Sequence, residues 1–255
     1  MIDLIVFKVA NNSYALDIGN IKRIIQDVEL TTIPNNNEFI DGIMNYEDGI
    51  LKVLNLRKLV GVKSYVEELY DMFSKIKVVH SEWVDELSNS ISGCYEFTKT
   101  TNPHECELGK WLDSFNSYDD FILDVLKDLR ENHNQLHRLG KDVISICEED
   151  NDRAREIFDT QIKIFYTNTI DYIDTFMSQL PKIAYSLQKM IIYEDEQGLF
   201  AIRIDSIEDI AHIQESDIKY FDNQREENDL LEIGGVLDLN SNLINIINTI
   251  QLPHE

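Results

Sequence analysis

The stretch FIDGIMNYEDGILKVLNLRKL, residues 39–59, decides the fold because it recurs near the other end of the chain. It aligns without a gap with EIGGVLDLNSNLINIINTIQL, residues 232–252, and Gly42 falls on Gly235. Any two β-rich segments share Ile and Val at a period of two, so chance is the alternative explanation. Aligned glycines before an apolar pair are harder to obtain by chance, which favours an internal repeat.

A second pair of segments extends the repeat toward the start of the chain. Residues 7–25, FKVANNSYALDIGNIKRII, align with residues 193–211, YEDEQGLFAIRIDSIEDIA. Both copies consist of short runs of β-branched and apolar residues separated by Asn, Asp and Gly, which is typical of strands joined by turns. Many short strands favour small barrels. We therefore predict two copies of one β unit.

The middle of the chain has a different pattern. Apolar residues recur there at i, i+3, i+4 and i+7, which predicts three long amphipathic helices, over residues 64–92, 119–150 and 152–180, and a shorter one over 106–115. Pro103 falls in a loop and Pro181 at a helix exit. The expected fold class is α+β, with a four-helix bundle over residues 64–188 inserted between two β halves, 1–63 and 189–255.

The charge balance limits the classes of partner. The chain has 47 acidic and 23 basic residues and a net charge of -24. Nucleic acid and anionic lipid surfaces bind through Lys and Arg, so both are unfavourable partners. No apolar run has the length of a signal peptide or a membrane span. We expect a cytoplasmic protein without membrane insertion.

The pentapeptide HNQLH, residues 133–137, places two histidines on one face of a predicted helix. Side chains at i and i+4 lie one turn apart, so His133 and His137 can point at a common centre. An isolated pair of this kind is more often solvated or at the edge of a core. Further ligands are needed before a metal site is indicated.

Two earlier residues can complete such a site. Cys106 precedes His133 by 27 residues, and His80 lies in the first long helix. Packing of the helices can bring them to the histidine pair, and three imidazoles with one thiolate suit zinc. His104 is the alternative to His80. We favour His80 because it shares its helix with the apolar residues Ile76, Val79 and Trp83.

These motifs resemble a known family. HSEW at 80–83, CELGKWL at 106–112 and HNQLH are similar to the chemoreceptor zinc-binding (CZB) domain, whose Zn²⁺ is held by three histidines and one cysteine. The resemblance implies that the ligands are His80, Cys106, His133 and His137. It also covers both tryptophans, Trp83 and Trp111, and implies a possible homodimer through the helical bundle.

A closed zinc site does not favour an enzyme. A hydrolytic site needs an open coordination position and a general base, as in H-E-x-x-H, but Asn134 follows His133 here. Two regulatory interpretations stay open. An oxidant such as hypochlorite could oxidise Cys106 to a sulfenate, or zinc occupancy itself could be the signal.

Other polar residues near these motifs receive weaker assignments. Glu82, Asp85 and Glu131 are candidates to accept hydrogen bonds from the zinc-ligating imidazoles, although such carboxylates are more often a solvated helix face. Cys94 and Cys147 are interpreted as small buried hydrophobic residues.

The β halves resemble a second family. Residues 7–25, 33–61, 198–210 and 234–252 are similar in pattern and order to CheW, the chemotaxis coupling protein. That family has two small β-barrel subdomains and links the cytoplasmic tips of chemoreceptors to the CheA-type histidine kinase. The sequence departs from the family at Glu47 and Asp48, where Arg-Gly is usual, and at Asn55, where Asp is usual.

Together the two resemblances imply a cytoplasmic, non-enzymatic chemotaxis adaptor that senses zinc or an oxidant. Its partners would be the CheA-type kinase and the chemoreceptor tips. The alternative is a structural-zinc or zinc-storage protein whose β domain has an unrelated binding role.

Overall fold

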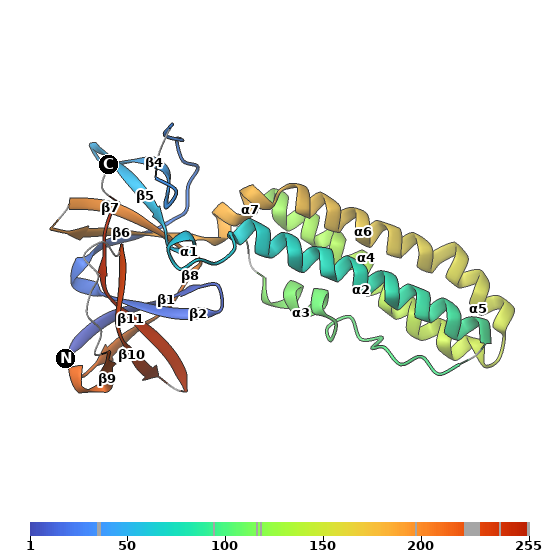
Figure 1. The fold of residues 1–255 in the computed structure, drawn as a ribbon. Coiled ribbons are helices and arrows are strands. Elements are labelled where there is room, and N and C mark those ends of the chain that lie inside the picture. Colours follow the sequence, from blue (N-terminus) through green and yellow to red (C-terminus); the bar gives the residue numbers. More distant parts are fainter. Residues whose placement is uncertain are drawn as a thin grey trace. The chain divides into compact units, whose positions relative to one another are not determined.

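The computed structural model describes residues 1–34, 37–93, 95–115, 117, 119–196, 198–221, 230–239 and 241–253. The chain forms two compact units, one of Met1–Tyr65 with Ala184–Glu255 and one of Val66–Ile183 (Figure 1). The first unit is built from strands and the second from helices, which confirms the predicted α+β class. Among the described residues, no helix has both the length and the apolar character needed to cross a membrane.

The β unit contains two sheets. The first has the strand order β8 (Ser206–Ile213), β1 (Ile2–Val9), β2 (Asn12–Asp17), β11 (Asn242–Ile250), β10 (Leu231–Leu239) and β9 (Ile218–Tyr220). The second has the order β3 (Ile21–Gln26), β6 (Lys189–Asp195), β7 (Gly198–Ile204), β5 (Gly49–Asn55) and β4 (Ile40–Tyr46). The short helix α1 (Leu56–Leu59) follows β5. The 3₁₀ turn η1 (Ile18–Asn20) connects β2 to β3, and η3 (Glu215–Asp217) connects β8 to β9.

The sequence repeat corresponds to a repeat in strand pairing. The hairpins β4–β5 and β10–β11 are both antiparallel and both shift register near the aligned glycines, Gly42 and Gly235. The two parallel contacts also use equivalent positions, since Val53 pairs with Ala201 and Ile246 pairs with Ala15.

Each sheet nevertheless draws strands from both copies of the repeat. The hairpin β1–β2 of the first copy pairs with β8 and β11 of the second, and the hairpin β6–β7 of the second pairs with β3 and β5 of the first. The two halves of the chain are therefore interlocked in one unit.

Buried residues fill the space between the sheets and line a separate interior in each. Phe7 and Phe200 are completely buried in the shared cluster, while Leu4 and Val53 belong to the clusters of the first and the second sheet. Strands buried on both faces read as continuous apolar runs such as the buried Leu4–Phe7 segment of β1, because neither face has to meet water.

The helical unit contains the predicted long helices with two differences. Its elements are α2 (Tyr65–Gly93), α3 (Glu107–Ser114), α4 (Asp120–Cys147), α5 (Asn151–Ile157), a π-helical turn η2 (Phe158–Ile162), α6 (Lys163–Ser178) and α7 (Leu180–Leu187). The third long helix is thus interrupted by η2. The third long helix ends at Ser178, near the predicted exit, but Pro181 itself lies in the first turn of α7, where its missing N–H is not needed.

An aromatic cluster fixes α3 against the long helices. The Trp111 ring of α3 lies 4.8 Å from Phe73 of α2 and 5.3 Å from Phe176 of α6, measured between ring centroids. Phe73 and Phe176 are almost fully buried. Burial of such large rings stabilises the position of α3, and therefore that of the residue that begins it.

Candidate metal centre

Four potential metal donors meet inside the helical unit. The nearest donor atoms of His80, Cys106, His133 and His137 all lie within 4.8 Å of one another. His80 is at the middle of α2, His133 and His137 are on α4, and Cys106 is the N-cap of α3. The three imidazoles are no more than 2% exposed. These are the four residues that the sequence analysis named as candidates.

Helix geometry brings the imidazoles together. His133 and His137 are one turn apart on α4, and their ring centroids are 4.6 Å apart. The His80 ring is 5.3 Å from His133 and 5.9 Å from His137. The sulfur of Cys106 lies 3.1 Å from Nε2 of His133. The cluster therefore draws donors from α2, α4 and the start of α3.

One hydrogen bond fixes the orientation of His80. Its Nδ1 is 2.8 Å from the carbonyl oxygen of Ile76, one turn earlier on α2, so Nδ1–H donates to that oxygen. The lone pair of Nε2 is then directed at the other donors. A backbone carbonyl that orients a ligating imidazole in this way is a common feature of metal sites.

Burial keeps the imidazoles neutral. It lowers the pKa of His133 to about 2, with further lowering by His137 and His80, and lowers the pKa of His137 to about 4. The pKa of His80 is also lowered by burial. Burial raises the pKa of the Cys106 thiol, which the backbone N–H of Gly109 partly opposes. Neutral imidazoles are the form that binds metal, because protonated rings offer no lone pair.

The donor set fits zinc. Nε2 of His80, Nδ1 of His133 and both ring nitrogens of His137 are buried without a hydrogen-bond partner among the described residues. Leaving such groups unpaired is unfavourable, and a cation would satisfy the donors that face it. Three nitrogens and one sulfur make a closed set of the kind that structural zinc sites use.

The Trp83 ring packs against the imidazole of His137. The two rings are 4.9 Å apart, and Nε1–H of Trp83 donates to the carbonyl oxygen of Thr100 at 2.9 Å. Trp83 packs directly on Gly140 of α4, where an added Cβ would come within 2.3 Å of the indole. Sequence analysis missed Gly140, although a glycine inside a strong helical pattern is a signal of close packing.

Cys106 also stabilises the start of α3. Its sulfur accepts a hydrogen bond from the backbone N–H of Gly109 at 3.3 Å, which is the role of an N-cap side chain. Gly109 contacts the preceding loop so closely that a Cβ would lie 1.7 Å from the carbonyl oxygen of Pro103. The loop, the cap and the sulfur donor are thus one packed structure.

The other residues considered as ligands or as hydrogen-bond acceptors lie outside the cluster of four donors. The alternative ligand His104 is exposed, and its Nδ1 is 2.8 Å from a carboxylate oxygen of Asp113. Glu82, Asp85 and Glu131 are exposed, which agrees with the solvated-face interpretation, and Nδ1 of His80 faces the Ile76 carbonyl instead. A backbone carbonyl is available on every residue, so no side-chain pattern indicates it.

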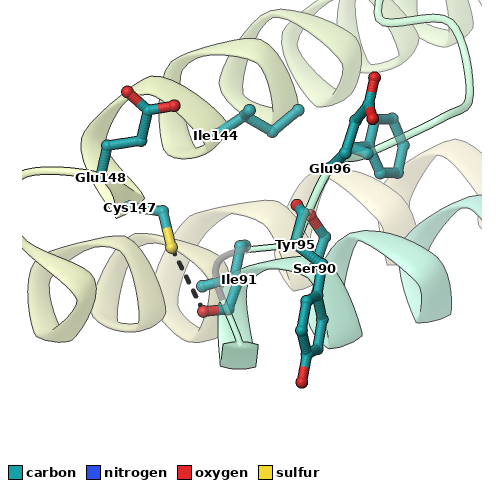
Figure 2. A pocket seen from close by; sticks show the side chains of 8 residues that line it. Ser90, Ile91, Tyr95, Glu96, Ile144, Cys147 and Glu148 are labelled. Atoms are coloured by element: carbon teal, nitrogen blue, oxygen red, sulfur yellow. Dashed lines mark hydrogen bonds between the residues drawn. The ribbon is translucent and has the colours of Figure 1, made fainter.

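A pocket of about 310 Å³ lies apart from the four donors in the helical unit and is lined by Ser90, Ile91, Tyr95, Glu96, Phe97, Ile144, Cys147 and Glu148 (Figure 2). Cys147 is buried as predicted, and its sulfur is 3.3 Å from the carbonyl oxygen of Ile91. Cys147 is disulfide-bonded, which its interpretation as a merely buried residue did not include. Cys94 lies outside the described residues.

Two family models match parts of the chain. Residues 80–144 match the family described as the chemoreceptor zinc-binding domain, and residues 3–83 match the CheW-like domain. A curated relative, the chemotaxis protein CheW of Thermotoga maritima, is 28% identical over 60 residues. That match covers 24% of this chain and 40% of the relative, so it spans less than half of the relative's length.

Two solved structures are similar to parts or most of the chain. The scaffolding protein TtCheW from Thermoanaerobacter tengcongensis has a TM-score of 0.46 at 14% identity, over 98% of this chain and 90% of its own. The regulatory CZB domain of DgcZ has a TM-score of 0.38 at 15% identity, over 46% of this chain and 98% of its own. One segment of the chain thus matches the CheW-like domain and another matches the chemoreceptor zinc-binding domain, and neither match covers half of the chain.

Proposed function

We propose that the protein is a cytoplasmic chemotaxis adaptor that couples chemoreceptor tips to a CheA-type histidine kinase. Zinc or an oxidant acting at His80, Cys106, His133 and His137 would control this coupling. The two family matches support the adaptor role and the presence of a zinc site. The observation that carries the proposal is that Cys106 is at once a donor in the cluster and the cap of α3.

The double role of Cys106 links ligation to helix order. When zinc is bound, it supplies a positive charge that keeps the Cys106 sulfur deprotonated. Three buried imidazoles and the cap of α3 then form one closed arrangement. Loss of the ion leaves the nitrogens of His80 and His137 unpaired and weakens the start of α3. The helical unit therefore has a more ordered and a less ordered state.

Oxidation gives the same outcome by a different route. The Cys106 thiolate attacks the oxidant hypochlorous acid, donates an electron pair, and becomes a sulfenic acid as chloride leaves and the O–Cl bond breaks. The overall change converts one thiolate and one HOCl into one sulfenic acid and one chloride. Cys106 is partly exposed, whereas the three histidines are buried, so the thiolate is the donor nearest to solvent. A sulfenic acid is a poorer zinc ligand than a thiolate.

The site supports binding rather than catalysis. Asn134 follows His133, so the acid that serves as general base in H-E-x-x-H sites is missing at that position. All four donors come from the protein, which leaves no position for a substrate in a tetrahedral site. We accordingly propose an adaptor without enzymatic activity.

The β4–β5 turn bears on the choice of partner. Glu47 has a φ of 51°, and both Glu47 and Asp48 are exposed at the tip of this hairpin. The related family usually has a basic residue here. A reversed charge favours a partner with a basic patch and disfavours one with an acidic patch. We also propose that the helical unit forms a homodimer, as the resemblance implies.

A binding measurement tests the proposal. Purified protein, zinc-loaded or treated with a chelator, is titrated with a CheA-type kinase and a receptor tip, beside Cys106→Ser and the control His104→Ala. We expect affinity to change on zinc removal in the wild type and in His104→Ala, and Cys106→Ser to behave as the metal-free protein. An affinity that changes neither on zinc removal nor in Cys106→Ser would favour the structural-zinc or zinc-storage role.

A further inference from the structure

Two buried arginines lie where the chain leaves the β unit and where it returns. Arg57 is in α1, just before α2, and is 2% exposed. Arg203 is in β7 and is 8% exposed. Charged groups are rarely buried to this degree unless they are paired. The partners of each arginine therefore show which segments of the chain it connects.

Arg57 holds the outgoing segment. Its Nε and Nη2 donate to the two carboxylate oxygens of Asp205 at 2.7 and 2.6 Å. Its Nη1 donates to the carbonyl oxygen of Lys63 at 2.8 Å, and the guanidinium lies 4.8 Å from the centre of the Tyr65 ring. Tyr65 is the first residue of α2. The bidentate pair with Asp205 thus involves the guanidinium that also contacts Tyr65, the residue of the β unit at which α2 begins.

The returning segment is held by the same carboxylate. Nε2 of Gln188, the residue after α7, donates to Asp205 at 3.3 Å. The carbonyl oxygen of Gln188 accepts from the backbone N–H of Asp27 at 3.2 Å and from Nε2 of Gln26 at 2.8 Å. All of these contacts lie within the β unit.

A second ion pair, between Arg203 and Asp27, lies beside the returning segment. Nη2 of Arg203 donates to Asp27 at 3.0 Å, and its guanidinium lies 5.5 Å from the centre of the Tyr185 ring in the last turn of α7. The carboxylate of Asp205 also accepts from the backbone N–H of Ala10, in the β1–β2 turn, at 2.6 Å. Asp205 therefore contacts the ends of both sheets, since it follows β7 of the second sheet.

We propose that Arg57, Asp205, Gln188 and the Arg203–Asp27 pair form a junction network that transmits changes in the helical unit to both sheets. A buried network of paired charges and hydrogen bonds has few alternative arrangements, because moving one member leaves the others unpaired. A shift at Tyr65 or at Tyr185 thus perturbs one shared carboxylate. The physiological signal in this scheme rests on the proposed function, but the coupling itself does not.

Hydrogen exchange of the full chain tests the network. Peptides from β7 and α4 are followed with zinc bound, after zinc removal, and in Leu136→Ala, which perturbs the buried core of the helical unit without using the metal. The junction is removed by the double variant Arg57→Met with Asp205→Leu, since apolar replacement of both partners of a buried pair is generally tolerated. Gln188→Ala is the milder variant if the double variant does not fold.

The control removes an exposed ion pair of the same unit, Lys8 with Glu208, as Lys8→Gln with Glu208→Gln. In the wild type and the control, we expect both perturbations to speed exchange in β7 by about fivefold or more. In the junction variant, α4 should still respond and β7 should not. An equal β7 response in the junction variant, or no β7 response in the wild type, overturns the proposal. If the wild type binds no zinc, that result contradicts the proposed function and not the junction network. The response of β7 to Leu136→Ala then tests the junction network alone.

Discussion

At the scale of residues, the candidate centre is defined by how each donor is held. His80 is oriented by the Ile76 carbonyl, His137 is backed by Trp83, and Cys106 is held as the cap of α3. None of the three depends on a charged neighbour for its position. A metal centre supported by backbone and packing contacts keeps its geometry when surface charges are screened by salt.

We predict that zinc content depends on the four donors and not on the nearest other histidine. Cys106→Ser and His133→Leu should each bind zinc at least about tenfold more weakly, because a tetrahedral site loses one of its protein ligands. His104→Ala is the matched control and should bind like the wild type, since His104 is exposed and paired with Asp113. Metal analysis after dialysis at fixed free zinc gives the result. Full zinc content in Cys106→Ser would contradict the assignment.

The metal-free protein should become less stable as pH falls below about 6.5. Unfolding returns the histidines to their ordinary pKa near 6.5, whereas burial holds His137 at about 4 and His133 at about 2 in the folded state. The unfolded state therefore binds more protons in this range, and the free energy of unfolding falls with pH until the folded rings also protonate. Urea unfolding between pH 7 and 4.5 measures it.

The control for this pH effect is His133→Leu. This variant has one titrating imidazole fewer, so its stability should depend less steeply on pH over the same range. A slope equal to that of the wild type would show that other groups cause the effect.

The sequence was sufficient to name the four clustered residues but not the contacts that orient them. Histidine spacing and the Cys106 motif are patterns of residue types, which can be read directly from the sequence. The Ile76 carbonyl, the capping hydrogen bond of Cys106 and the packing of Trp83 on Gly140 depend on the local backbone path and on contacts between helices. Such features leave at most a weak trace in the pattern of residue types.

At the scale of elements, the repeat is the feature that the sequence revealed most clearly. Aligned glycines and apolar residues predicted equivalent hairpins, and β4–β5 and β10–β11 are equivalent in register. The exchange of strands between the copies was not predicted, because the parallel contacts β2–β11 and β5–β7 join residues far apart in the chain. The π-helical turn η2 was missed because it preserves the apolar stripe of the flanking helices.

The two aligned glycines should both be sensitive to substitution. A Cβ at Gly42 would lie 2.6 Å from the carbonyl oxygen of Thr31, and one at Gly235 would lie 2.7 Å from that of Lys219. We expect Gly42→Ala and Gly235→Ala each to lower the free energy of unfolding by about 1–3 kcal/mol, because rigid backbone must move. Denaturant unfolding measures the change.

Gly49→Ala is the matched control, as its added Cβ would be 3.8 Å from the nearest atom outside its neighbours, the carbonyl oxygen of Tyr46. This variant should change stability by less than about 0.5 kcal/mol. A change as small as that of the control at either Gly42 or Gly235 would contradict the close backbone contact that both hairpins share.

At the scale of the whole molecule, the chain consists of two units with separate cores, joined by two covalent connections. Both tryptophans, Trp83 and Trp111, belong to the helical unit. Tryptophan fluorescence therefore reports the unfolding of that unit alone. This separation makes it possible to measure where zinc acts.

Zinc should raise the midpoint of thermal unfolding followed by tryptophan fluorescence. An ion that binds only the folded state stabilises it by an amount that grows with the ratio of free zinc to the dissociation constant, about 2.7 kcal/mol at a hundredfold ratio. The same titration in His80→Ala should leave the midpoint unchanged. A zinc-dependent midpoint in His80→Ala equal to that of the wild type would place the ion elsewhere.

X-ray absorption at the zinc edge tests the central claim most directly, because it reports the atoms bound to the metal in the intact protein. We predict three nitrogen neighbours at about 2.0 Å and one sulfur neighbour at about 2.3 Å, with the sulfur lost in Cys106→Ser. A first shell made only of nitrogen and oxygen in the wild type, or a sulfur neighbour that persists in Cys106→Ser, would contradict the claim that His80, Cys106, His133 and His137 hold zinc.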